Sequence, residues 1–171
     1  PKGKDPVQAD KDYVVLVSDF PKEHENAILR NLKMDSDYYN FAQRTIGDFF
    51  KDVDNKGWKA TWEDRKAWGN MRMSPTDLSD VTGYTFLMNG MTPDQNWTGL
   101  FKPGEKVRLR FINASAMSFY DIRIPGLVMS VVSSDGQNVE PVKINEFRFG
   151  PAETYDVVVQ PKADKAYTIA A

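Results

Sequence analysis

The sequence predicts a mainly β protein, a β-sandwich that carries an α-helical insertion after its first strand. Two observations lead to this fold class. Seven short segments with strand-like patterning follow one another from Tyr84 onward, and turn dipeptides such as Asn89-Gly90 separate most of them. Between an early apolar run and this β region, residues 23–76 change to helical spacing.

The first predicted strand, Tyr13 to Phe20, is a continuous apolar run, which is the pattern of a strand buried on both faces. A first helix is indicated by Ile28, Leu29 and Leu32 at helical spacing.

The strongest helical signal runs from Ser36 to Val53, with Ser36 or Asp37 as the capping residue. Its predicted apolar stripe consists of Tyr38, Phe41, Ala42, Thr45, Phe49 and Val53. Farther on, Thr61 precedes Asp64 by three residues, a weak capping box, and Ser74-Pro75 stops or restarts the helix. We therefore expect two or three helices in the insertion.

The predicted strands after the insertion span residues 84–90, 105–115, 118–124, 127–136, 144–150, 154–161 and 166–170. The second is the clearest, because it follows the turn Lys102–Glu105 and alternates strictly. Its apolar positions are Val107, Leu109 and Phe111, and its basic positions are Lys106, Arg108 and Arg110. Short strands with regular turn signals predict an antiparallel arrangement.

The composition is that of an ordinary globular protein: 171 residues, 41% hydrophobic and 27% charged, which suits one domain with a sizeable insertion. A net charge of −2 without a basic block does not favour nucleic acid as a partner. No apolar run approaches the length that crosses a bilayer, so no membrane partner is predicted, and no signal peptide is visible.

The two ends of the sequence lead us to expect a fragment of a longer protein. It starts at Pro1 instead of an initiator Met, and Tyr167 to Ala171 is patterned as a strand with no turn after it. Residues 1–12 are polar and predicted to be a linker or tail from a preceding domain, and residues 13–171 are predicted to form the domain itself.

The sequence lacks the residues of several common reaction centres. It has no Cys and a single His, His24, whereas a blue copper site needs one thiolate and two imidazoles. We therefore predict no catalytic residue, no bound cofactor and no metal ligand in this chain. His24, in a charged segment, is predicted to be a solvated residue at a helix start; a Ser-His-Asp triad through it would lack the Gly-x-Ser-x-Gly elbow.

Other candidate groups have more ordinary explanations. Carboxylate pairs occur at Asp35/Asp37, Glu63/Asp64 and Glu153/Asp156, but pairing alone does not create an acid and a base. Two glycosylation patterns start at Asn96 and Asn113. Asn113 is predicted to serve a strand-end turn, and Trp97 to cover the rim of the sandwich rather than to bind a ligand.

Four of the seven methionines are candidates for contact with Cu(I), because thioethers are soft ligands. They are Met71, Met73, Met88 and Met91. The alternative is that they fill gaps in the core or cover the surface. Met88, at the end of an alternating run, favours that alternative, and the Met71–Met73 end of the insertion is predicted to lie closest to any copper route.

The chain resembles the second cupredoxin domain of three-domain, laccase-like multicopper oxidases. In the β half the resemblance lies in "NGMTPDQNWTGLFKPGEKVRLRFINAS", "SFYDIRIPG" and "DGQNVEPVKINEFRFGPAETYDVVVQP". In the helical half, "SDYYNFAQRTIGDFFKDV" and "WEDRKAWGNMRMSPTDLSDVTG" resemble the insertion of the copper-resistance branch, the periplasmic oxidases of bacterial copper tolerance. The resemblance covers nearly the whole chain from Tyr13 onward.

The resemblance implies a cupredoxin-like Greek-key β-sandwich that serves as the non-catalytic middle domain of a periplasmic oxidase, between flanking cupredoxin domains of the same chain. The parent would oxidise Cu(I) or phenolic substrates and reduce O2 to water. The family's copper ligands lie in His-x-His and His-Cys-His motifs of the outer domains, and this sequence contains neither. Two alternatives stay open: a stand-alone β-sandwich binding module, such as a weak Met-based Cu(I) carrier, and a free-standing enzyme that uses carboxylates.

Overall fold

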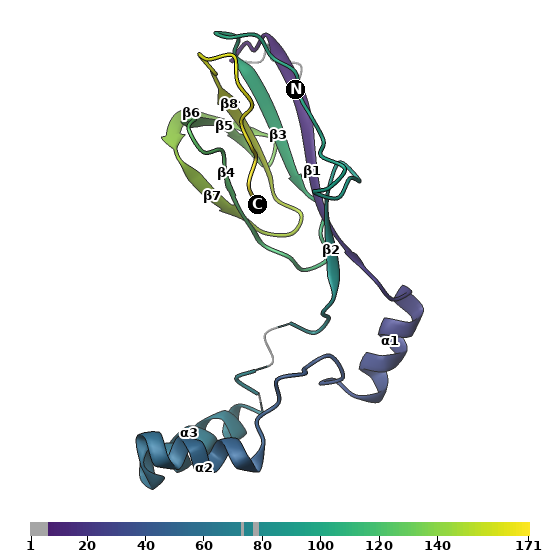
Figure 1. Ribbon diagram of the computed structural model, residues 1–171, viewed down its shortest axis with the longest axis vertical. Coiled ribbons are helices and arrows are strands. Elements are labelled where there is room, and N and C mark those ends of the chain that lie inside the picture. Colours follow the sequence, from purple (N-terminus) through teal and green to yellow (C-terminus); the bar gives the residue numbers. More distant parts are fainter. Residues whose placement is uncertain (1–6, 73, 77–78) are drawn as a thin grey trace. The chain divides into compact units, whose positions relative to one another are not determined.

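The computed structural model describes residues 7–72, 74–76 and 79–171. The chain forms two compact units (Figure 1). The β unit joins the segment that ends at Phe20 to Tyr84–Ala171, and the helical unit is Pro21–Gly83. All hydrogen bonds and packing described below lie within one unit or the other.

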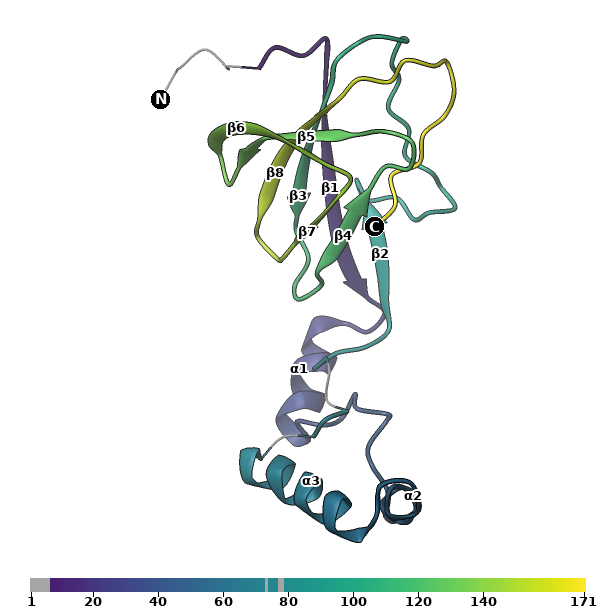
Figure 2. The same cartoon turned by 90° about the vertical axis from the view of Figure 1, so that its left-hand side faces the viewer.

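The strands of the β unit form two sheets, seen as separate layers in Figures 1 and 2. The larger sheet has the strand order β2-β1-β3-β8-β5-β6, and the smaller pairs β4 with β7. The strands are β1 (Lys11–Pro21), β2 (Tyr84–Met88), β3 (Val107–Asn113), β4 (Tyr120–Arg123), β5 (Met129–Ser134), β6 (Gln137–Ile144), β7 (Glu146–Phe149) and β8 (Thr154–Val159). The mainly β sandwich expected from the sequence is confirmed.

The core lies between the two sheets. Every second residue of β3, namely Val107, Leu109 and Phe111, points into it, as the alternation predicts. Ile122 and Phe149 reach it from the smaller sheet. These side chains are almost fully buried, so the sandwich has a continuous apolar core that stabilises it without a disulfide or a metal.

The larger sheet is mixed, which corrects the expectation of a purely antiparallel arrangement. β1 runs parallel to β3, with Val15 opposite Phe111, whereas β8 is antiparallel to both β3 and β5. Parallel neighbours need a crossover of a dozen or more residues. The helical insertion and β2 lie between β1 and β3 in the chain and form that connection.

Two expectations about side-chain burial were wrong. β1 is buried on one face only, since Val15 and Val17 lie in the core while Val14 is 51% exposed. On β3, Arg108 is buried and donates to the carbonyl of Val7 instead of facing solvent. A charged side chain is accepted at such a position only where it is paired.

The sequence did not predict strand β6, and the strand predicted at residues 166–170 is nearly absent from the structure. β6 carries Pro141 and is solvent-exposed along most of its length, so it lacks both the apolar alternation and the composition of a strand. It lies at the edge of the larger sheet, where a residue without an N–H is tolerated. The predicted strand 166–170 is reduced to one bridge, in which Ala170 and Arg123 exchange two backbone hydrogen bonds.

The helical unit contains α1 (Glu25–Met34), α2 (Ile46–Lys56) and α3 (Trp58–Met71). The first helix is confirmed. The second begins at Ile46, not near Ser36, because Thr45 and Asp48 form a complete capping box there. Upstream, the side chain of Asp35 accepts from the N–H of Asp37, a local bond that competes with helix formation.

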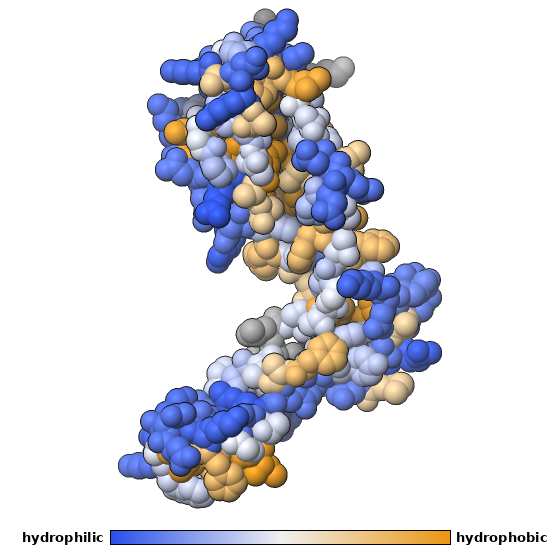
Figure 3. All heavy atoms as spheres, viewed as in Figure 1, coloured by the Kyte–Doolittle hydropathy of each residue, from blue (hydrophilic) through white to orange (hydrophobic). Residues whose placement is uncertain are grey.

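The α2–α3 hairpin turns at a single residue, Gly57, whose φ of 83° suits a residue without a Cβ. α3 therefore starts earlier than predicted, and Thr61 is not its cap. Its hydroxyl lies inside the helix and donates to the Gly57 carbonyl at 2.9 Å. Figure 3 shows that one side of this hairpin carries hydrophilic residues and the other hydrophobic ones.

Candidate functional site

The candidate site with soft donor atoms is the turn between β2 and Met91. Met88 and Met91 exchange two backbone hydrogen bonds of 2.9 and 3.0 Å around Asn89-Gly90. Both central residues have positive φ, 50° and 77°, which is the geometry of a type I′ turn. The Asn-Gly pair that marked this turn in the sequence forms it in the structure.

Asn89 also fastens this turn to β1. Its backbone N–H donates to the carbonyl of Leu16 at 2.7 Å, its side-chain oxygen accepts from the N–H of Leu16 at 2.8 Å, and its side-chain amide donates to the carbonyl of Val14 at 2.9 Å. The position of the turn on the sheet is therefore fixed by three hydrogen bonds.

The two methionines of the turn differ in burial. Met88 is half-buried and packs on the core, as predicted, and Met91 is 42% exposed. Residues directly opposite each other in an antiparallel pair place their side chains on the same face. The side chains of Met88 and Met91 therefore start from the same face of the turn. Met71 is the last residue of α3, in the helical unit, and Met73 lies outside the described residues.

His24 is at a helix start, as predicted. It is the N-cap of α1, and its Nδ1 accepts from the backbone N–H of Asn26 at 3.3 Å. The imidazole is mostly exposed and lies beside the carboxylate of Glu25. An exposed capping histidine with this role serves the helix terminus.

Members of the carboxylate pairs noted in the sequence contact backbone groups or a cation. Asp35 accepts from the N–H of Asp37, and Glu153 accepts from that of Gly150 at 2.7 Å. The guanidinium of Arg110 forms an ion pair with the carboxylate of Asp156, with an N–O distance of 3.0 Å. Each of these carboxylates therefore stabilises backbone or pairs a cation, which is a structural function.

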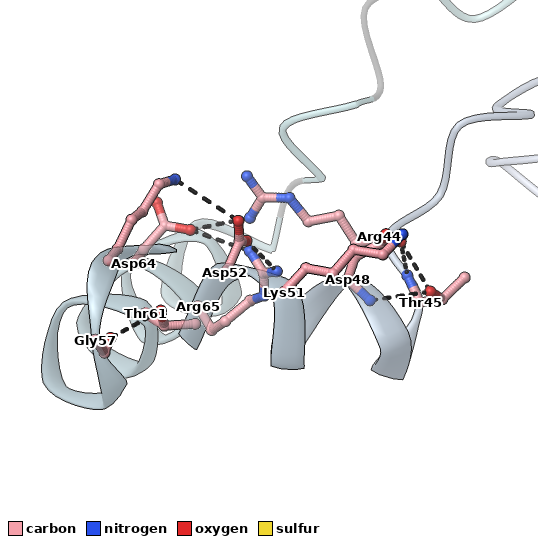
Figure 4. A network of polar contacts seen from close by, with 10 residues as sticks. Arg44, Thr45, Asp48, Lys51, Asp52, Gly57, Thr61, Asp64 and Arg65 are labelled. Carbon is pink, nitrogen blue, oxygen red and sulfur yellow. Dashed lines mark hydrogen bonds and ion pairs between the residues drawn. The ribbon is translucent and has the colours of Figure 1, made fainter. Parts of the chain in front are cut away.

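The carboxylate of Asp64 belongs to an ion-pair network on the α2–α3 hairpin (Figure 4). It accepts from Arg44 at 3.0 Å and from Arg65 at 3.2 Å, and Arg65 also donates to Asp52 of α2 at 2.7 Å. Burial acts to raise the pKa of Asp64, but the hydrogen bond and charge of Arg44 outweigh it, so the pKa is lowered. The network joins the two helices through Arg65 and Asp52 and favours the ionised form of Asp64.

Asp19, at the end of β1, is a structural carboxylate that the sequence alone does not reveal. It accepts from the backbone N–H groups of Ala116, Met117 and Ser118 at 2.8, 3.3 and 3.2 Å, and from the Ser118 hydroxyl at 2.7 Å. Burial acts to raise its pKa, yet these four donors together lower it. The carboxylate fixes the loop that follows β3.

Asn113 ends β3 and serves the same loop, as predicted. It is buried, its amide donates to the carbonyls of Ser118 and Phe149, and its oxygen accepts from the N–H of Ser115. A buried amide bonded on both sides is not an acceptor for a glycan. Trp97 packs on the core edge-on to Tyr13, with ring centroids 5.9 Å apart, which confirms its predicted rim position.

The helical unit contains an open hollow of about 190 Å³, lined in part by Ile28, Tyr39 and Val81. The Tyr39 hydroxyl donates to Glu23 at 3.0 Å and accepts from Asn31 at 3.1 Å. Because these polar groups bind one another, the contacts between α1 and the turn that follows it account for the hollow.

Among the residues that the structure describes, no cluster of three or more His, Asp or Glu side chains could hold a metal ion. Within the same ranges, no helix combines the length and the apolar character needed to cross a membrane.

Comparison with known proteins shows which family has this architecture. The family model described as "Multicopper oxidase" matches residues 11–171, almost the whole chain. The chain belongs to the multicopper oxidase family. This confirms the resemblance seen in the sequence and, with it, the cupredoxin-like fold.

Two relatives are more than 50% identical to this chain over the part that they share with it. Copper resistance protein A of Pseudomonas syringae pv. tomato is 56% identical over 170 residues, which are 98% of this chain and 28% of the relative. Copper resistance protein A of Escherichia coli is 57% identical over 167 residues, 96% of this chain and 27% of the relative. The chain thus corresponds to little more than a quarter of the length of these relatives.

Solved structures support the same fold. The crystal structure of Fet3p, a multicopper oxidase that functions in iron import, gives a TM-score of 0.65 at 16% identity and covers 98% of this chain and 24% of that one. A blue copper oxidase from Nitrosomonas europaea gives 0.57 at 18% identity over 97% of this chain and 39% of the other. At such identities the likeness concerns the fold alone.

Proposed function

We propose that this chain is the non-catalytic middle domain of a periplasmic copper-resistance oxidase, placed between cupredoxin domains of the same polypeptide. The observation that carries the proposal is a family match over residues 11–171 in a sequence with no Cys and with one His, which caps a helix. A blue copper centre takes a thiolate and two imidazoles. Such a centre therefore has to be built from residues elsewhere in the protein.

In this proposal copper is bound by the other domains, which oxidise Cu(I) or phenolic substrates and reduce O2 to water. Residues 13–171 form the spacer, with a helical insertion at about 23–76 and residues 1–12 as the linker from the preceding domain. The spacer contributes rigidity. Its buried core and the Asp19 and Asn113 bonds at the end of β3 hold the sandwich in one shape.

The test compares the full-length protein with this 171-residue chain after identical copper loading. We expect O2 consumption with Cu(I) or a phenol, together with the visible thiolate-to-copper absorption, from the full-length protein only. The control is the full-length protein stripped of copper by a chelator, which should lose both signals. Copper-dependent turnover by the 171-residue chain would contradict the proposal.

A second candidate function is supported by one observation, the backbone pairing of Met88 with Met91 on a turn fixed to β1. Two soft donors on the same face suit weak binding of Cu(I) as cargo. In this case the domain would also handle the substrate ion.

The measurement is an anaerobic Cu(I) titration of the 171-residue chain against a competing chelator. If the turn binds one equivalent of Cu(I) through both sulfurs, either Met88→Leu or Met91→Leu alone should abolish that binding. Leucine keeps the side-chain volume and removes the sulfur. Met34→Leu, an exposed methionine at the end of α1, is the matched control and should bind like the wild type. Binding that survives both turn substitutions would exclude this site.

A further inference from the structure

The helical unit exposes a set of large apolar side chains that its own helices do not cover. We call it the aromatic face and define it by Ile46 and Phe50 of α2 and by Trp58 and Trp62 of α3. Their exposed fractions are 79%, 59%, 61% and 57%. Single exposed apolar residues are ordinary, but a contiguous group of this size on a folded protein marks a contact surface.

The aromatic face is continuous. Ile46 and Phe50 are four residues apart on α2, as are Trp58 and Trp62 on α3, so each pair lies on one side of its helix. Phe49 joins the two pairs, with its ring edge-on to Phe50 at 5.8 Å and to Trp58 at 5.4 Å between centroids. The four side chains therefore form one surface.

The hairpin has little core of its own. Thr61 is the one buried residue that α2 and α3 contribute, and it is polar. Arg65 of α3 pairs with Asp52 of α2 at 2.7 Å (Figure 4), and the rings of Phe49 and Trp58 form a second link between the two helices. Helices of this length are stabilised chiefly by packing of an apolar face against another element. The Phe49 contacts cover only part of the aromatic face, since each of its four side chains remains more than half exposed.

The size of the aromatic face indicates the kind of partner. Four side chains that are more than half exposed present on the order of 500 Å² of surface, since an aromatic side chain can bury 150–250 Å². A stable complex between free proteins buries roughly 800 Å² on each partner. Contacts between domains of one chain bury about 600–1,500 Å² in total, or roughly half of that on each side. The aromatic face fits the second case.

The relatives provide the second argument. Their similarity runs through the hairpin, and about a quarter of their length is matched here, so such a protein has much further chain tethered to this one. A tethered partner is present at a high effective concentration, which lets a small surface bind stably. We propose that the aromatic face of the α2–α3 hairpin docks on another domain of the same polypeptide. This inference rests on the proposed function only in requiring a longer chain.

The experiment is hydroxyl-radical footprinting, read by mass spectrometry, of the full-length protein and of the 171-residue chain. Trp68, on the same helix, serves as the internal reference. In the 171-residue chain we expect rapid oxidation of Phe50, Trp58 and Trp62. In the full-length monomer we expect their oxidation to fall about fivefold or more relative to Trp68, since the centre of an interface excludes water.

Substitutions identify the surface. Trp62→Glu in the full-length protein should restore oxidation of Trp58 and Phe50, because a charge at the centre of an apolar contact opposes docking. Ala67→Glu is the matched control: five residues farther along α3, it lies on another side of the helix and should leave the protection intact. Circular dichroism of both variants in the 171-residue chain shows whether the helices persist.

Three results would overturn the proposal. They are equal oxidation in the two proteins, protection already present in the 171-residue chain, and protection that vanishes on dilution, which would assign the face to a second copy. Loss of the proposed function is distinguishable, because protection is measured without copper and without turnover. A full-length protein that lacks oxidase activity but shields the aromatic face would contradict the proposed function and leave this inference standing.

Discussion

Asp19 shows how one carboxylate can fix a loop far away in the sequence. Its two oxygens accept from three consecutive backbone N–H groups and one hydroxyl in residues 116–118. These donors would otherwise lack partners at the end of the sandwich. Because hydrogen bonds to a charged group are stronger than those between neutral groups, this residue contributes more to stability than an ordinary loop aspartate.

Replacement of Asp19 by Ala should lower the free energy of unfolding by about 1.5–3 kcal/mol, the range for losing a hydrogen bond to a charged group. The pKa of Asp19 is lowered in the folded protein, so its contribution is complete above the ordinary pKa of the unfolded chain and is lost as the pH falls through the folded value. Urea unfolding should therefore give a difference between wild type and variant that is constant near neutral pH and shrinks below about pH 4.

The control is Asp121→Ala. Asp121 also has a lowered pKa, because Arg148 donates to it at 2.7 and 2.8 Å, but this pair lies on the surface. Exposed ion pairs contribute little. No measurable change is expected, and a loss as large as that of Asp19→Ala would show that lowered pKa values, rather than loop anchoring, determine the stability.

The sequence could not reveal Asp19 because all its partners come from beyond the insertion and β3. By contrast, the turn at Asn89-Gly90, the helix cap at His24 and the strand-end turn at Asn113 were interpreted correctly, since these features involve backbone close in sequence. The additional bonds from Asn89 to Leu16 and from Asn113 to Phe149 join distant segments and were not predicted. Residues whose function depends on local backbone are predictable from a single sequence. Residues that bridge distant segments are not.

At the scale of single elements, helix starts were the least predictable feature. The segment from Ser36 carries apolar residues at helical spacing, yet α2 begins only after Thr45. Local side-chain bonds such as that from Ala42 N–H to Asn40 shape the earlier residues into turns. Periodicity describes which residues could share a face, whereas capping decides where the helix begins.

Thr45→Ala should therefore destabilise the helical unit by about 1 kcal/mol, the usual effect of losing an N-cap. Hydrogen exchange of the amides in α2 provides the measurement, because it reports opening of this unit separately from the sandwich. Ser36→Ala, at the cap predicted from the sequence, is the matched control and should leave exchange unchanged. The reverse result would place the helix start where the sequence suggested.

β6 presents the same problem in a sheet. An exposed strand with a proline at the edge has little reason to show apolar alternation, since neither of its faces is buried. The strands that the sequence predicted well, β3 and β8 above all, place alternate residues in the core. Apolar alternation occurs in the sequence where one face of a strand is buried, so an exposed edge strand does not show it.

At the scale of the whole molecule, the core of the sandwich is complete without the insertion. All buried members of the core cluster lie in the β unit, and β1 and β2, which flank the insertion, are hydrogen-bonded neighbours. Replacement of residues 22–82 by a short Gly-Ser linker should therefore leave a protein that unfolds cooperatively and keeps its near-ultraviolet circular dichroism. A variant with secondary structure but no near-ultraviolet signal would show that the sandwich depends on the helices.

The parallel pairing of β1 with β3 has a consequence for how the protein is made. Val15 finds its partner Phe111 only after the whole insertion has been synthesised. The apolar segment Tyr13–Phe20 thus lacks its β3 neighbour until residues 107–113 have been synthesised, and closing so long a loop is slow. During that interval the unpaired apolar segment is exposed to aggregation.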